Sequence, residues 1–107
     1  MDIRTVLGDT RVVPVIVLEE ADQAVDLART LCDAGLPALE ITLRTAAAPE
    51  AIRRIASRVP DAVVGAGSVR SAAHLRECVD AGARCAVSPG SSPGLLDAAA
   101  GAAVPLV

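Results

Sequence analysis

Two ionisable residues, Glu40 and Arg44, stand in the otherwise largely apolar run Ala38-Leu39-Glu40-Ile41-Thr42-Leu43-Arg44-Thr45. The β-branched and aliphatic residues of this run predict a short β-strand. Successive side chains of a strand alternate between its faces, so Glu40, Thr42 and Arg44 would share one face. A parallel strand that is covered on both faces usually has no polar side. The pattern therefore indicates a polar face that opens on a functional site, and a structural ion pair or a solvent contact is the alternative interpretation.

The composition describes a globular chain and excludes several classes of function. The 107 residues are 52% hydrophobic and 21% charged, with a net charge of −3, which fits one domain or part of a larger one. Nothing is basic enough to predict a nucleic-acid partner. The longest apolar run, Val12 to Leu18, is too short to span a membrane, and the N-terminus lacks a signal-peptide pattern, so we expect a cytoplasmic protein.

The side-chain inventory limits the chemistry further. The three cysteines have no C-x-x-C spacing, and the sequence contains only one histidine. Neither a zinc site nor a disulfide framework is therefore predicted, and we expect no metal or cofactor. Cys85, at the start of a predicted strand, is expected to behave as a small hydrophobe. The chain has no aromatic residue, and all ten basic residues are arginine, so it contains no lysine.

The elements that must position Glu40 and Arg44 follow a regular order. Strands are predicted at 12–18, 38–45, 62–69 and 85–88, and a fifth begins at 104–107. Helices are predicted from Glu19 to a left-handed cap at Gly35, over 47–58, from an N-cap at Ser71 to Gly82, and from Ser92-Pro93 onward.

The first four predicted strands start every 23–26 residues, which is the repeat of a parallel α/β fold. A doubly wound sheet and a (β/α)₈ barrel both fit this repeat, and in both folds functional residues gather at the C-terminal ends of the strands. Arg44, Ser68 and the turn Ser88-Pro89-Gly90 all fall at such ends. Their agreement favours the functional interpretation of Glu40 and Arg44.

Four motifs, in register over nearly the whole chain, resemble the 2-keto-3-deoxy-6-phosphogluconate (KDPG)/4-hydroxy-2-oxoglutarate (KHG) aldolase family. They are Val12-Val13-Pro14-Val15-Ile16, Leu39-Glu40-Ile41-Thr42-Leu43-Arg44-Thr45, Val64-Gly65-Ala66-Gly67-Ser68-Val69 and Val87-Ser88-Pro89-Gly90. The resemblance implies a (β/α)₈ TIM barrel, of which residues 1–107 would form about the first four βα units and the start of strand five. It also implies a trimeric lyase that releases pyruvate, with glyceraldehyde 3-phosphate or glyoxylate, through a Schiff base.

The resemblance also implies roles for individual residues. Glu40 would be the general acid/base, which needs dry surroundings that raise its pKa, and neighbouring Leu39 and Ile41 are expected to supply them. Arg44 would hold the carboxylate of the keto acid, helped by Ser68, which stands where the family usually has threonine. Pro89 and Gly90 would shape the rim of the pocket. The Gly65-Ala66-Gly67 run would let substrate approach the backbone, or would simply form a tight strand exit.

One departure is serious, because the family forms its Schiff base on a lysine of the sixth strand and this sequence has no lysine. Arginine stays protonated and cannot replace it, and nothing places the Met1 amine in the site. The chain is thus expected to be the N-terminal half of an aldolase barrel that is inactive alone. A non-catalytic module that binds keto acids or assembles with a partner is the second hypothesis, and another phosphate-handling barrel is the third.

A half-barrel leaves two open sheet edges and exposes apolar surface. We therefore expect the chain alone to be marginally stable, and to dimerise, aggregate or require the other half.

Overall fold

The chain is built on a parallel sheet, which a computed structural model describes within residues 2–107. Its strands are β1 (Val15–Ile16), β2 (Ala38–Thr42) and β3 (Val63–Gly67), and they lie side by side in chain order. Beyond β3, Ala86 forms a parallel bridge with Ala66, and Leu106 forms one with Ala86. Each successive segment therefore adds to the same edge of the sheet, as the βα repeat predicts.

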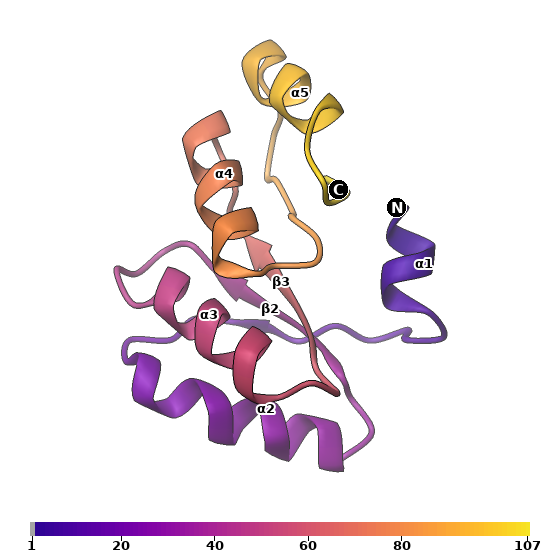
Figure 1. Cartoon of the computed structure of the whole chain (residues 1–107), viewed down its shortest axis with the longest axis vertical. Helices are drawn as coiled ribbons and strands as arrows, with labels where there is room; N and C mark the ends of the chain where they lie inside the picture. Colours follow the sequence, from indigo (N-terminus) through magenta and orange to yellow (C-terminus); the bar gives the residue numbers. More distant parts are fainter. Residues whose placement is uncertain (1) are drawn as a thin grey trace.

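The helices lie in two groups on either side of the sheet (Figure 1). A 3₁₀ turn, η1 (Ala21–Gln23), leads into α2 (Ala24–Asp33), which is followed by α3 (Ala48–Arg58), α4 (Ala72–Ala81) and α5 (Pro93–Ala100). These four helices pack against one another in chain order on one side of the sheet, whereas α1 (Ile3–Leu7) lies on the other. The side that carries α1 is called the inner face below.

Local signals set the helix ends where the sequence predicts them. The side chains of Ser71 and Ser92 accept hydrogen bonds from the backbone N–H groups three residues on and so cap α4 and α5. Gly82 ends α4 with a φ of 101°. Gly35, with a φ of 88°, follows the cap of α2, where the N–H of Leu36 bonds the carbonyl of Leu31 as in a Schellman motif.

The core lies between the sheet and helices α2 to α5. Leu39 and Ile41 of β2 are fully buried in one cluster with Ile52 and Ile55 of α3. Because strand side chains alternate, Glu40 points to the opposite, inner face. The predicted division of β2 into an apolar and a polar face is confirmed.

Several predicted strands are shorter than expected, and one helix was not predicted. The segment 12–18 pairs with β2 only at Val15–Ile16, and the segments 85–88 and 104–107 form single bridges. β2 ends at Thr42, so Arg44 lies in the following turn and not on the strand. The short helix α1, capped by the side chain of Asp2, was not predicted.

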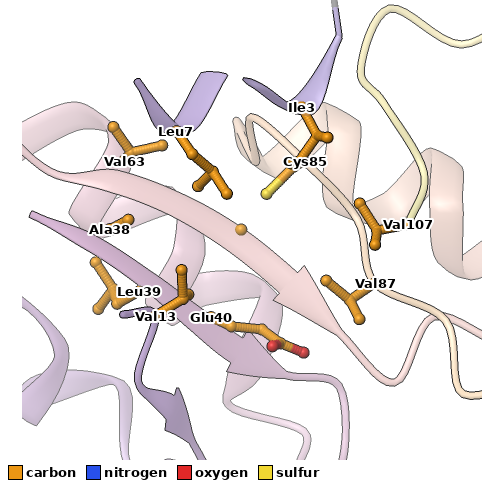
Figure 2. Close-up of a pocket in the computed structure, with 11 residues that line it drawn as sticks. Ile3, Leu7, Val13, Ala38, Leu39, Glu40, Val63, Cys85, Val87 and Val107 are labelled. Carbon is orange, nitrogen blue, oxygen red and sulfur yellow. The ribbon is translucent and has the colours of Figure 1, made fainter. Parts of the chain in front are cut away.

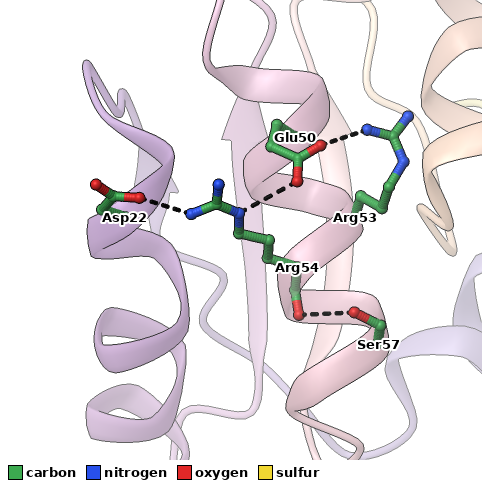
Figure 3. Close-up of polar contacts among 5 residues, drawn as sticks. All are labelled: Asp22, Glu50, Arg53, Arg54 and Ser57. Carbon is green, nitrogen blue, oxygen red and sulfur yellow. Dashed lines mark hydrogen bonds and ion pairs between the residues drawn. The ribbon is translucent and has the colours of Figure 1, made fainter.

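An ionic network ties η1 to α3 on the outer surface (Figure 3). Arg54 lies 2.7 Å from Asp22 and 3.2 Å from Glu50, which also contacts Arg53 at 2.6 Å. The hydrogen bonds from the two arginines, first that of Arg53, lower the pKa of the Glu50 carboxyl. Within residues 2–107, no helix has the length and apolar character needed to cross a bilayer.

Candidate active site

The Glu40 carboxylate lies at one end of an apolar cavity of about 130 Å³ on the inner face of the sheet. Figure 2 shows it beside β2 and β3, with Val87 near the carboxylate and α1 at the far end of the cavity. The cavity walls include Val13, from the segment 12–18, and Cys85 and Val87, both from the segment 85–88. Glu40 itself is half-buried.

The surroundings of Glu40 favour its protonated form. Desolvation by burial raises the pKa of its carboxyl above the ordinary value, and the positive charge of Arg44 opposes that rise. Of the two neighbours expected to supply dry surroundings, Leu39 lines the cavity, whereas Ile41 belongs to the core cluster behind the sheet and does not. The other apolar residues of the inner-face cavity complete these surroundings.

Arg44 and Ser68 meet at the ends of two neighbouring strands. The Nε–H of Arg44 donates a hydrogen bond of 3.4 Å to Oγ of Ser68, across 24 residues of sequence. Two hydrogen bonds join this region to β1 and the residues after it. The hydroxyl of Thr42, at the end of β2, donates to the carbonyl of Ile16, and the hydroxyl of Thr45, next to Arg44, donates to the carbonyl of Leu18. The predicted convergence of Arg44 and Ser68 is thus seen in the structure.

The backbone of Ser68 is unusual, because its φ of 57° lies in the left-handed region. Non-glycine residues enter this region at a cost of about 1–2 kcal/mol. Ser68 is nevertheless 9% exposed and carries the hydroxyl that Arg44 reaches. Strained backbone of this kind is concentrated at functional sites, so the conformation supports a functional role for this strand end.

The structural ion pair that was the alternative interpretation of Glu40 and Arg44 is absent. In the part of the chain that the structure describes, the two side chains form no ion pair, and the recorded partner of Arg44 is Ser68. The Arg44 guanidinium is therefore directed to the end of β3 and not to Glu40.

The turn Ser88-Pro89-Gly90 is held by its own hydrogen bonds. The Ser88 hydroxyl donates to the carbonyl of Gly90, whose N–H donates back to Ser88 Oγ at 3.2 Å. The N–H of Val69 bonds the carbonyl of Val87 at 3.0 Å, which places this turn beside the end of β3. Pro89 and Gly90 are exposed, and within residues 2–107 no hydrogen bond joins either of them to the other predicted site residues.

The sequence predicted Cys85 as a small hydrophobe, but not that its thiol forms part of the Glu40 cavity. Cys85 is free and buried, and the pKa of its thiol is raised by burial and then by the negative charge of Glu40. Val87, two residues on, lines the same cavity. The alternation of these two residues along the predicted strand was the only available signal of their shared face.

This arrangement can carry acid/base chemistry on a small carboxylate. Glu40 supplies a carboxyl group whose pKa is raised by burial, and Arg44 with Ser68 supplies N–H and O–H donors at adjacent strand ends. The described residues include no side-chain amine, since the sequence has no lysine.

Comparisons with known proteins agree with this interpretation of the site. The family model "KDPG and KHG aldolase" matches residues 3–107. A 2-dehydro-3-deoxy-phosphogluconate aldolase of Dickeya dadantii is 50% identical over 96 residues, which are 90% of this chain and 45% of that protein. The chain spans about half the length of the curated relatives that it matches.

Two solved structures are similar over the same region. A KDPG aldolase of Legionella pneumophila, with pyruvate captured as a covalent carbinolamine intermediate, has a TM-score of 0.89 and 39% identity over 95% of this chain and 50% of its own. A KDPG aldolase of Zymomonas mobilis with 3-phosphoglycerate has a TM-score of 0.91 and 40% identity over 99% of this chain and 50% of its own.

Proposed function

The chain belongs to the KDPG and KHG aldolase family, and from this premise we propose that its 107 residues carry the acid/base and carboxylate-binding part of an aldolase site. The reaction would be cleavage of a 2-keto-4-hydroxy acid to pyruvate and an aldehyde. The position of Glu40 carries this proposal, because its half-buried carboxyl stands at the end of an apolar cavity that raises its pKa.

Glu40 would move protons at two steps of this reaction. An amine adds to the C2 carbonyl of the substrate to give a carbinolamine, the kind of intermediate captured in the Legionella pneumophila relative. The protonated Glu40 carboxyl gives its proton to the carbinolamine hydroxyl, which leaves as water while the nitrogen lone pair forms the iminium ion. The resulting carboxylate takes the proton of the C4 hydroxyl as the C3–C4 bond breaks, which yields the aldehyde and the enamine of pyruvate.

Arg44 and Ser68 would hold the C1 carboxylate of the keto acid throughout. A guanidinium forms two parallel hydrogen bonds to a carboxylate and keeps its charge at every working pH. The Ser68 hydroxyl already lies within reach of Arg44, so one carboxylate could contact both groups. Pro89 and Gly90 would form the rim beside them, which stays a prediction.

No side chain of these 107 residues can supply the nucleophilic amine, because the sequence contains no lysine and arginine remains protonated. The Met1 amine lies outside the described residues. We propose that the C-terminal half of a barrel supplies the amine and packs on the open edges of the sheet, where Val15 is 64% and Val107 57% exposed. Assembly as a homotrimer and a cytoplasmic location remain predictions from the sequence.

A chimera tests the proposal directly. This chain replaces the matching segment of the Dickeya dadantii relative, and the chimera is assayed for KDPG cleavage and for a borohydride-trapped pyruvate adduct. We expect turnover in the chimera and a loss of at least 100-fold, on the order seen when a general acid/base is removed, in its Glu40→Gln variant. Glu50→Gln, on the outer surface of α3, is the matched control and should leave turnover unchanged.

Two outcomes would contradict the proposal. Full turnover in the Glu40→Gln chimera would remove Glu40 from the acid/base role. A pyruvate-sized adduct on the 107-residue chain alone, after borohydride treatment, would show that the chain does carry a usable amine, and the Met1 amine would then be the group to examine.

A keto-acid-binding module without catalysis is the second candidate, and the absence of lysine favours it. It uses Arg44 and Ser68 in the same way but requires no proton transfer by Glu40. Three results together would favour this candidate. The chimera would be unreactive, the 107-residue chain would bind pyruvate, and Arg44→Ala but not Glu40→Gln would weaken that binding.

A further inference from the structure

Two glycines of β3, Gly65 and Gly67, stand where side chains from neighbouring strands cross the sheet. A methyl group added at Gly67 would overlap Oε1 of Glu40 and would lie 2.6 Å from its Cδ and 2.9 Å from its Cγ. A methyl group added at Gly65 would lie 2.6 Å from the Cys85 sulfur. The space above Gly67 is therefore filled by the Glu40 side chain, and the space above Gly65 by the Cys85 side chain.

Backbone conformation does not require glycine at either position. The positive-φ glycines among the described residues are Gly8, Gly35 and Gly82, and neither glycine of β3 belongs to that set. Glycine inside a strand weakens it, and its usual reason there is the close approach of another group. At Gly67 that group is the carboxylate of Glu40.

The register of β2 and β3 shows where the Glu40 carboxylate lies along the sheet. The Cα of Glu40 pairs with that of Gly65, whereas the Cα of Gly67 pairs with that of Thr42, the last residue of β2. The Glu40 side chain thus leans by two residues, about 7 Å along the strand, toward the carboxyl end of the sheet. Ser68, which bonds Arg44, is the next residue after Gly67.

We propose that Gly67 is a positioning residue, whose missing side chain forms the seat that directs the Glu40 carboxylate to the strand end beside Arg44 and Ser68. The proposal rests on the acid/base role proposed for Glu40. It also replaces both sequence-based interpretations of the Gly65-Ala66-Gly67 run, because the space above these glycines holds side chains of this chain.

The experiment compares Gly67→Ala with Gly65→Ala, which changes the same strand and face but meets Cys85 instead of Glu40. The titration of Glu40 is followed by carbon-13 NMR of the side-chain carboxyl groups of the full chain. The Glu40 signal is assigned as the one that disappears in the Glu40→Gln variant. Arg44, beyond the end of β2, is the charged group that acts on the Glu40 carboxyl, and Glu40 in turn acts on the thiol of Cys85 on the neighbouring segment.

We expect Gly67→Ala to lower the Glu40 pKa toward that of an ordinary glutamate, because the added methyl group displaces the carboxylate from its partly buried seat toward solvent. Gly65→Ala, whose added methyl group meets the Cys85 sulfur in the wall of the same cavity, should shift the titration by less than Gly67→Ala does. An unchanged titration in Gly67→Ala, or an equal shift in both variants, would overturn the proposal.

A crossed set of double variants covers the case in which Gly67→Ala does not fold. Replacing Glu40 by alanine removes the overlap, so Gly67→Ala/Glu40→Ala should regain the melting temperature of Glu40→Ala alone. Cys85→Ala should rescue Gly65→Ala but not Gly67→Ala. Failure of Glu40→Ala to rescue Gly67→Ala would show that Gly67 has another purpose.

The seat and the proposed function can fail separately. A Glu40→Gln chimera with full turnover would remove the acid/base role, whereas the titrations and the double variants would still measure whether Gly67 holds the carboxylate.

Discussion

The left-handed backbone at Ser68 predicts an inversion of the usual effects of alanine and glycine on stability. Alanine at this position keeps the φ of 57° and its steric cost of about 1–2 kcal/mol, whereas glycine adopts the same conformation freely. Glycine loses about 0.5–1 kcal/mol of this advantage, because the unfolded chain has more conformational freedom at glycine than at alanine. Ser68→Gly should therefore be more stable than Ser68→Ala by up to about 1 kcal/mol.

A matched pair at Ser57 serves as the control, because Ser57 is an exposed residue of α3. There alanine should exceed glycine by about 1 kcal/mol, the difference between their helix propensities. The assay is urea unfolding followed by circular dichroism, and 1 kcal/mol corresponds to about 4–8 °C in melting temperature for a chain of this size. If Ser68→Ala equals or exceeds Ser68→Gly in stability, the strain assigned to Ser68 is wrong.

The same two variants separate the hydroxyl of Ser68 from its backbone. Both lose the oxygen that accepts the hydrogen bond from Arg44, so both should bind pyruvate more weakly than the unmodified chain and to the same extent. Chemical-shift titration with pyruvate measures this binding. Unequal weakening would mean that the backbone conformation, and not the hydroxyl, governs the carboxylate site.

Three further predictions concern charge, packing and association. Glu40→Gln should stabilise the chain at neutral pH. Burial raises the pKa of the Glu40 carboxyl in the folded state above its pKa in the unfolded state. The free energy of unfolding of the parent chain therefore falls as the pH rises from the unfolded pKa through the folded pKa, and the glutamine variant avoids this loss. Urea midpoints from pH 3.5 to 8 check this, and a Glu40→Gln chain with the same pH dependence as the parent would refute it. Ile55→Ala, at a fully buried position, should cost about 2–5 kcal/mol, a large share of the total of about 5–15 kcal/mol for a small domain, and equilibrium unfolding measures the loss. Light scattering after size exclusion should show concentration-dependent association that Val15→Glu reduces and the outer-face control Leu96→Glu does not; a monodisperse, cooperatively melting monomer would contradict this expectation.

The helix ends and the central strands could be predicted because their signals are local. Ser71, Ser92, Gly35 and Gly82 each act within a few residues of their own position, and the structure confirms all four. The alternation along β2 likewise placed Glu40 correctly on the inner face. Such features depend on dihedral angles and short-range hydrogen bonds that the neighbouring sequence determines.

The lengths of the outer strands could not be predicted, because pairing depends on partners distant in sequence. The segment 12–18 has strong β propensity along its whole length, yet ladder pairing is limited to Val15–Ile16 and β2. β propensity describes how a residue fits a paired, half-buried surface and not where a partner strand runs. The five-residue helix α1 was missed because its cap at Asp2 and its apolar spacing extend over too few residues.

The candidate site shows the same division between local and distant information. Glu40 could be selected as an ionisable residue inside an apolar strand, and Arg44 and Ser68 by their positions at strand ends, where the structure brings Arg44 and Ser68 into contact. The seat of Glu40 could not be predicted, since it combines Gly67 of β3 with a side chain from β2 that leans two residues along the strand. A glycine spacing in the sequence gives no indication of which side chain will lie above it.

The proposed seat would let one short strand combine burial with the acid/base role proposed for Glu40. Leu39 and Ile41 hold β2 in the core, so the strand cannot shift without opening the packing against α3. Gly67 leaves space for the carboxylate at the strand end, and the apolar cavity behind it favours the bound proton. Enlarging residue 67 should therefore alter the protonation of Glu40 without weakening the contact between Arg44 and Ser68. Loss of pyruvate binding together with the change in titration would show that the two parts of the site are not independent.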